Sequence, residues 1–156
     1  MSRTITETLI PAVFSSLELV KKVTNVCPDT LWTEKAGAWP LWQHLAHTIS
    51  GTDFFVPGQS VNPPASLPPE VAQLKAIGLP VSKKELSDFL EAVTTKLGQF
   101  LAQLQDEDLV KPNEKIQKVG LDFTLGRTLI VLAAHPLYHI GHADAVLRQA
   151  GLNGVF

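Results

Sequence analysis

The sequence is read most easily from one run of nine residues, AHPLYHIGH (134–142), which holds three of the chain's five histidines. At about 3.6 residues per helical turn, these three fall within roughly 60° of one another. The other two, His44 and His47, lie three positions apart and share a face of a second predicted helix. Two such faces meeting in a helical bundle would form a metal site. The full set is His44, His47, His135, His139 and His142.

Apolar residues recur at three- and four-residue spacing in four long segments, which predicts an all-α fold. Ser82 and Glu85 have the pattern of a capping box at the start of the third segment. Thr124 suits the N-cap of the fourth segment, and Gly151 suits its end. The fourth segment is apolar on most faces, so we expect it to be the most buried helix. The predicted helices span residues 4–26, 40–56, 82–105 and 125–150.

A proline-rich stretch, residues 57–81, connects the second and third predicted helices. Loops of about 25 residues are uncommon in compact domains. This one is explained if the two helices point the same way, because the chain must then return along the bundle. A short helix is predicted within it at residues 69–77, and an extended piece is predicted later, at residues 117–123.

Length and composition predict a single globular domain over residues 1–156. The net charge of −2, with 13 Lys and Arg spread thinly, argues against nucleic acid as a partner. Cys27 is the one cysteine, which favours a reducing, cytoplasmic setting. No signal peptide is recognised, and the most apolar run, residues 129–134, is too short to span a bilayer.

Neutral imidazoles bind zinc, nickel, copper or iron, and three protein ligands leave one position open for water or substrate. The sequence has no cysteine cluster, no Glu-x-x-His pair and no nucleophile elbow, which disfavours other familiar site types. Asp53 and Asp144 are either partners of a histidine N–H or solvated and capping carboxylates. Histidines on apolar helices also occur as hydrogen-bonded core residues, so a bundle without metal stays open as an alternative.

The segment from Thr124 to His142, at the start of the fourth predicted helix, resembles the last helix of the DinB-like (DinB/YfiT-like) metalloenzyme superfamily, whose signature is His-x-x-x-His-x-Gly. In the second helix, Trp42 lies five residues before His47, and an acid and an aromatic lie six and eight residues after it. That spacing matches the family pattern for His47 rather than His44. The resemblance therefore implies a metal triad of His47, His135 and His139.

The same resemblance implies a four-helix bundle with up-down-down-up topology, which agrees with the long crossover between helices two and three. It implies a divalent metal ion, zinc or nickel first and iron or manganese as alternatives, and a homodimer. Relatives with an assigned activity include transferases and isomerases that use a low-molecular-weight thiol such as bacillithiol or mycothiol. The leading hypothesis is an enzyme that activates water or such a thiol toward a small-molecule substrate, as a hydrolase or S-transferase. The alternative is a non-catalytic metal-binding bundle that serves as a structural or interaction module.

Two features depart from the family pattern. Pro136 replaces an acidic or polar residue and cannot donate to the Leu132 carbonyl, so we expect a kink beside His135. His44 and His142 are additional histidines, which could be hydrogen-bonding partners of the ligands, alternative ligands or proton carriers. We take these two as the acid/base candidates. Tyr138 is a weaker one and is expected to be a packed residue with its hydroxyl satisfied.

Overall fold

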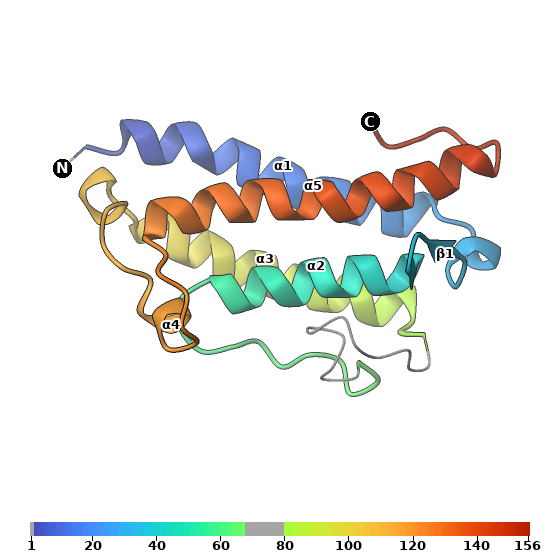
Figure 1. Ribbon diagram of the computed structural model, residues 1–156, viewed down its shortest axis with the longest axis horizontal. Helices are drawn as coiled ribbons and strands as arrows, with labels where there is room; N and C mark the ends of the chain where they lie inside the picture. The colour runs from blue at the N-terminus through green and yellow to red at the C-terminus, as the bar shows by residue number, and fades with distance from the viewer. Residues whose placement is uncertain (1, 68–79) are drawn as a thin grey trace.

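The described part of the chain forms four long helices, and the two that carry the histidines lie side by side in the computed structural model (Figure 1). The structure describes residues 2–67 and 80–156. Both α1 and α2 pack against α3 and α5. The predicted all-α class is confirmed. The long helices are α1 (Thr4–Val26), α2 (Leu41–Phe55), α3 (Lys83–Gln103) and α5 (Leu125–Gln149).

Short elements fill the connections between these helices. The strands β1 (Lys35–Ala36) and β2 (Trp39–Pro40) form a small antiparallel hairpin directly before α2. The extended piece predicted at residues 117–123 is wrong, because α4 (Glu114–Gln117) and a turn occupy the start of this segment. The short helix predicted at residues 69–77 lies outside the described residues. Single turns of 3-10 helix form η1 (Asp29–Leu31) and η3 (Asp106–Asp108).

The predicted N-caps of α3 and α5 are confirmed, as is the glycine predicted at the end of α5. At the start of α3, the Ser82 hydroxyl accepts a hydrogen bond from the Glu85 amide, and the Glu85 carboxylate accepts one from the Ser82 amide. At the start of α5, the Thr124 hydroxyl accepts from the Arg127 amide at 3.2 Å. Gly151 follows α5 with a φ of +77°, a conformation that glycine adopts without a steric penalty.

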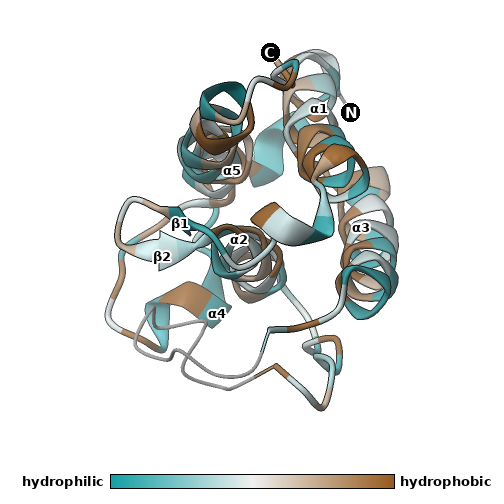
Figure 2. Ribbon diagram, turned by 90° about the vertical axis from the view of Figure 1, so that its right-hand side faces the viewer, coloured by the Kyte–Doolittle hydropathy of each residue, from teal (hydrophilic) through white to brown (hydrophobic). Residues whose placement is uncertain are grey.

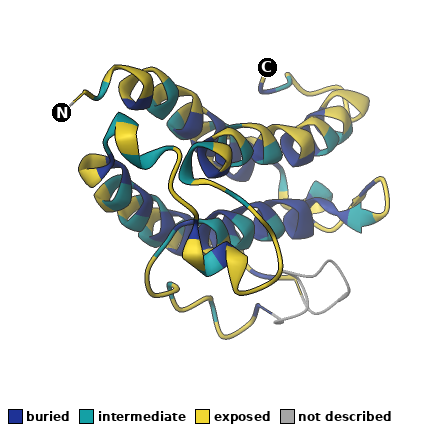
Figure 3. Cartoon of the chain, turned by 60° about the vertical axis from the view of Figure 1, so that its left-hand side comes forward, coloured by how far each residue is buried: buried dark blue, intermediate teal, exposed yellow. Residues whose placement is uncertain are grey.

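The most buried helix is α2, not α5 as predicted. In Figure 2, α2 lies in the middle, with α3, α5 and the β1–β2 hairpin around it. Residues 41–46 are all buried, whereas α5 leaves Ile130 and Tyr138 exposed at 60% and 64%. Figure 3 shows buried residues gathered on the sides of the long helices that face inward, and exposed residues on their outer sides. The apolar composition of α5 predicted that it is the most buried helix. The structure shows that α2 is more buried, because α3, α5 and the hairpin lie around it.

A largely buried ion pair and a second lysine fix the C-terminal end of α2. The Lys96 ammonium lies 2.7 Å from Asp53 Oδ1, which also accepts from the Val61 amide at 3.1 Å. The Lys115 ammonium donates to the carbonyl oxygens of Asp53 and Val56, at 2.9 and 3.2 Å. Cations near a helix C-terminus satisfy its unpaired carbonyls and its dipole. The helix that carries two of the histidines is thereby anchored.

Pro136 does not end α5, which continues as one helix to Gln149 (Figure 1). Proline has no N–H, so the Leu132 carbonyl loses its helical donor. The buried Ser16 hydroxyl of α1 lies 3.2 Å from that carbonyl and 2.8 Å from the carbonyl of Val13 in its own helix. Its one proton is therefore shared between the two carbonyls, and this partly replaces the hydrogen bond that the proline removes.

Replacing Ser16 with alanine is expected to lower the free energy of unfolding by about 1–2 kcal/mol, because the Leu132 carbonyl would be left buried without a donor. For a domain of this size that corresponds to roughly 2–8 °C in Tm. Chemical denaturation of the purified variant measures the loss. Ser15→Ala, at an exposed position of the same helix, should change stability by less than about 0.5 kcal/mol.

A double-mutant cycle makes this prediction specific for the proline. Pro136→Ala restores an N–H that can donate to the Leu132 carbonyl. In that background, Ser16→Ala should cost clearly less than in the native sequence. An equal cost in both backgrounds would show that Ser16 acts only within α1.

Candidate metal centre

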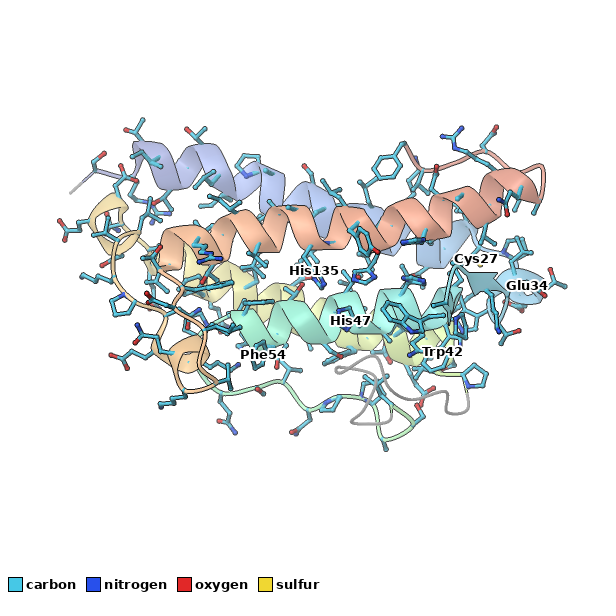
Figure 4. All side chains as sticks on the ribbon, viewed as in Figure 1. Cys27, Glu34, Trp42, His47, Phe54 and His135 are labelled. Atoms are coloured by element: carbon cyan, nitrogen blue, oxygen red, sulfur yellow. The ribbon has the colours of Figure 1, made fainter. Side chains whose placement is uncertain are left out.

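Three imidazoles converge between α2 and α5. His47 Nε2 and His139 Nε2 each lie 3.1 Å from His135 Nε2. Ligand atoms of the three rings all lie within 4.8 Å of one another. Figure 4 shows His47 and His135 pointing toward one another from the two helices. The structure thus brings together the three residues that the sequence predicts as ligands.

The donor set fits a divalent metal ion. Zinc–nitrogen bonds of about 2.0–2.1 Å in a tetrahedral arrangement separate ligand nitrogens by about 3.3–3.4 Å. The two 3.1 Å separations are close to that value. Without a cation, His135 Nε2 could carry at most one proton and donate it to only one of the two nitrogens beside it, His47 Nε2 or His139 Nε2. A cation would satisfy the lone pairs of all three nitrogens at once.

Burial and repulsion from neighbouring histidines favour the neutral form of His135 and His139, which is the metal-binding form. Burial, followed by the charge that His47 would carry, lowers the pKa of His135 to about 4. Burial and then the neighbouring histidines, His135 first, lower the pKa of His139 to about 3. Burial also lowers the pKa of His44, against the opposing effect of its hydrogen bond to Ala36.

Residues 16–143 match the family model described as the DinB superfamily. The match covers most of the chain and all five histidines. The chain belongs to the DinB superfamily. No curated protein and no solved structure matches it. The predicted family is confirmed, and the three histidines that converge in this DinB-superfamily chain are those that the resemblance implies as ligands.

His44 and His142 lie beside the triad in this DinB-superfamily chain. His44 is buried, with Nδ1 at 3.0 Å from His139 Nδ1 and Nε2 at 2.6 Å from the Ala36 carbonyl oxygen. The partly exposed ring of His142 stacks on His44, with centroids 4.9 Å apart and planes at 22°. Sequence reasoning named both residues without distinguishing them. The structure gives His44 protein partners at both nitrogens and places His142 nearer the surface.

Tyr138 is 64% exposed, so the prediction of a packed tyrosine is wrong. Its ring meets His139 and His142 edge-on, at centroid distances of 5.1 and 5.0 Å. The two carboxylates named as alternatives are paired elsewhere among the described residues. Asp53 binds Lys96, and Asp144 binds Arg148 Nε at 2.7 Å together with the Val155 amide. Asp53 therefore anchors the end of α2 and Asp144 the C-terminal residues, and neither is bonded to a histidine in the part of the chain that the structure describes.

Two contributors to the site were not predicted from the sequence. Gly51 lies one turn after His47, and a Cβ at this position would meet His135 Cε1 at 3.2 Å. A glycine inside a predicted helix is the signal that could have identified it, since such a glycine usually has a packing reason. Trp39 places its ring 5.2 Å from His44 and 6.1 Å from His139, and so covers one side of the cluster.

Gly51→Ala is expected to weaken metal binding about tenfold, because the methyl group would push the His135 ring by a few tenths of an ångström. Competition with a chromophoric chelator measures the metal Kd. Gly98→Ala is the matched control, since it is also a helix glycine but its added Cβ would meet only Phe14 Cζ, at an ordinary 3.9 Å. The control should bind metal normally and be as stable as the native protein or more so. Unchanged affinity in Gly51→Ala would contradict the close approach.

Proposed function

We propose that this chain is a metal-dependent enzyme whose three-histidine site activates water or a low-molecular-weight thiol, as a hydrolase or S-transferase. The convergence of three Nε2 atoms carries the proposal. Two of the rings, His47 and His135, are partly exposed, while His139 is 2% exposed. Such a set can hold an ion from the protein side and leave a coordination position facing solvent, as catalytic zinc sites do.

The triad would hold zinc or nickel, with iron or manganese as alternatives. When bound, such an ion lowers the pKa of water or a thiol enough to give a nucleophile near neutral pH. His142 is the acid/base candidate that we favour, because its partly exposed ring lies one turn beyond His139. It could hold or release a proton at the edge of the site. Trp39 would exclude water from one side of the cluster.

A non-catalytic metal-binding module is the second candidate, and an apolar groove between α1 and α5 favours it. Of the side chains along the groove, Ile130 is 60% exposed and Leu137 41%. Exposed apolar surface of this kind often marks an interaction site. We place the proposed homodimer contact on this groove, which is lined by Leu9, Ala12, Ser15, Ser16, Leu19, Ile130, Ala133, Ala134 and Leu137.

The topology, the domain organisation and the cellular location also belong to the proposal. The up-down-down-up topology is supported by Figure 1, where α1 and α5 run in one direction and α2 and α3 in the other. One core shared by the four long helices supports a single domain over residues 1–156. Among the described residues, no helix is long and apolar enough to cross a membrane. We propose a cytoplasmic location on the basis of the free thiol of Cys27.

An activity screen of untagged protein tests the proposed function. Protein loaded separately with zinc, nickel, manganese and iron(II) is assayed against esters and amides, and against an electrophile with a panel of low-molecular-weight thiols. We expect turnover that needs both the metal and the triad, and that is lost in His135→Ala. A structure with an anomalous signal shows whether a fourth protein ligand closes the site.

The outcomes separate the two candidates. Metal-dependent turnover with three histidine ligands supports the enzyme. Bound metal with a fourth protein ligand and no turnover supports the module, and a dimer broken by Ile130→Glu would locate its contact. Turnover that is unchanged in His135→Ala would overturn the proposed site.

A further inference from the structure

A line of contacts leads from the β1–β2 hairpin into the metal centre. The Ala36 carbonyl oxygen lies 2.6 Å from His44 Nε2, and His44 Nδ1 lies 3.0 Å from His139 Nδ1. His139 Nε2 then faces His135 Nε2 at 3.1 Å. The Ala36 carbonyl, His44 and His139 are therefore joined in series, and all three residues are buried.

The carbonyl at the start of this line determines where the protons lie. A carbonyl oxygen can only accept, so His44 Nε2 must carry a proton and donate it. A neutral imidazole has one N–H, which leaves His44 Nδ1 without a proton and able to accept. The hydrogen bond between the two Nδ1 atoms must then be donated by His139.

The proton on His139 Nδ1 also determines the state of the other ring nitrogen, Nε2. Neutral His139 with its proton on Nδ1 has an unprotonated Nε2. This is the nitrogen that faces the other two members of the triad. Ligand histidines in metalloproteins usually donate their second N–H to a carbonyl, a carboxylate or water, which fixes the ring and its tautomer. Here a second imidazole stands between the ligand and the carbonyl.

We propose that His44 is a positioning residue in a relay of two hydrogen bonds. His44 Nε2–H donates to the Ala36 carbonyl, so His44 Nδ1 accepts from His139 Nδ1–H, and the relay thereby keeps the His139 Nε2 lone pair directed toward the metal. The proposal rests on the proposed three-histidine site and separates the two extra histidines. His44 orients a ligand, and the acid/base role remains with His142.

The hairpin has the geometry to act as the fixed end of this line. A two-residue loop, Gly37-Ala38, joins its strands, and Gly37 has a φ of +77°, as the first loop residue of a tight hairpin often requires. A Cβ on Gly37 would lie 3.4 Å from His142 Nδ1. The Trp39 ring packs against His44 and His139. The hairpin thus presents a carbonyl, a close backbone turn and an aromatic ring to the same group of histidines.

The tautomer is measured directly in metal-free protein. Long-range ¹H–¹⁵N correlation spectra of ¹⁵N-labelled protein at about pH 8, above the ordinary histidine pKa of roughly 6.5, distinguish protonated from bare ring nitrogens. We expect His44 in the Nε2–H form and His139 in the Nδ1–H form. His139 in the Nε2–H form in the native protein would overturn the proposal without any variant.

Substitutions test the consequence for the metal. His44→Phe keeps a ring but has no acceptor, so zinc affinity measured by chelator competition should fall about 10- to 100-fold. His44→Asn keeps an oxygen acceptor near the Nδ1 position and should recover at least part of the loss, together with the Nδ1–H form of His139. His142→Phe is the matched control, and it should leave the His139 tautomer unchanged.

These measurements separate failure of the relay from failure of the metal site. If native protein shows the expected tautomers but binds none of zinc, nickel, manganese and iron(II), the relay stands and the proposed function fails. If native protein binds zinc and His44→Phe binds it equally tightly with His139 still in the Nδ1–H form, the relay fails and the metal site stands. Equal losses in His44→Phe and His44→Asn, with both variants folded, would also overturn the relay.

Discussion

His135→Ala should abolish stoichiometric binding of divalent metal, because only two of the three convergent nitrogens would remain. Elemental analysis of untagged native and variant protein measures the metal content. A metal that binds only the folded state also stabilises it, by about 2.7 kcal/mol when the free metal is 100 times its Kd. For a domain of 156 residues this is a rise in Tm of roughly 5–11 °C, which the variant should lack.

His142→Ala is the control for this experiment, since His142 lies outside the group of three and should leave metal content unchanged. The variant His47→Ala should behave like His135→Ala, although its histidine lies on a different helix. Equal metal content in native protein and His135→Ala would refute the triad.

The metal-free protein should lose stability steadily as the pH falls from about 6.5 to 4.5. The pKa values of His135 and His139 are lowered from 6.5 to about 4 and about 3 in the folded protein. In this window the unfolded chain therefore binds more protons, up to two from these residues. Each extra proton bound by the unfolded state lowers the free energy of unfolding by about 1.4 kcal/mol per pH unit. Urea denaturation at several pH values measures the slope.

A ligand variant identifies the source of this slope. His139→Leu removes one of the titrating rings, so the slope should fall by up to about 1.4 kcal/mol per pH unit in the same window. Measurements stay above pH 4.5 because carboxylates contribute at lower pH, as at Asp106. Desolvation raises the pKa of Asp106, but hydrogen bonds from Ser2, Thr6 and Ile5 outweigh it and lower that pKa to about 2. A stability that is flat from pH 6.5 to 4.5 would show that the histidines are protonated equally in both states.

Local sequence patterns predicted most of the helical framework. The cap of α3 is complete within residues Ser82 to Glu85, so its start could be identified without knowledge of the tertiary structure. The pairing of His135 with His139 follows from helix periodicity alone. The choice of His47 over His44 required the family resemblance, because spacing treats the two residues alike.

The remaining features depend on contacts between distant segments. The close approach of His135 to Gly51 exists only after α2 and α5 pack. The partner of His44 is the backbone carbonyl of Ala36, which any residue at that position would provide, so no side chain announces it. The exposure of Tyr138 was missed for a similar reason, since an apolar stretch does not show which of its faces has a neighbour.

The hydrogen bond from Ser16 to the Leu132 carbonyl has a consequence for how this sequence could have diverged. A proline at position 136 costs less stability where a hydroxyl from α1 reaches that carbonyl. Serine at position 16 is therefore expected to have preceded the proline, or to have arrived with it. Among relatives, residues 16 and 136 should vary together, with loss of the hydroxyl accompanied by loss of the proline. In this way α1, which contributes no proposed metal ligand, would constrain the residue that follows the proposed ligand His135.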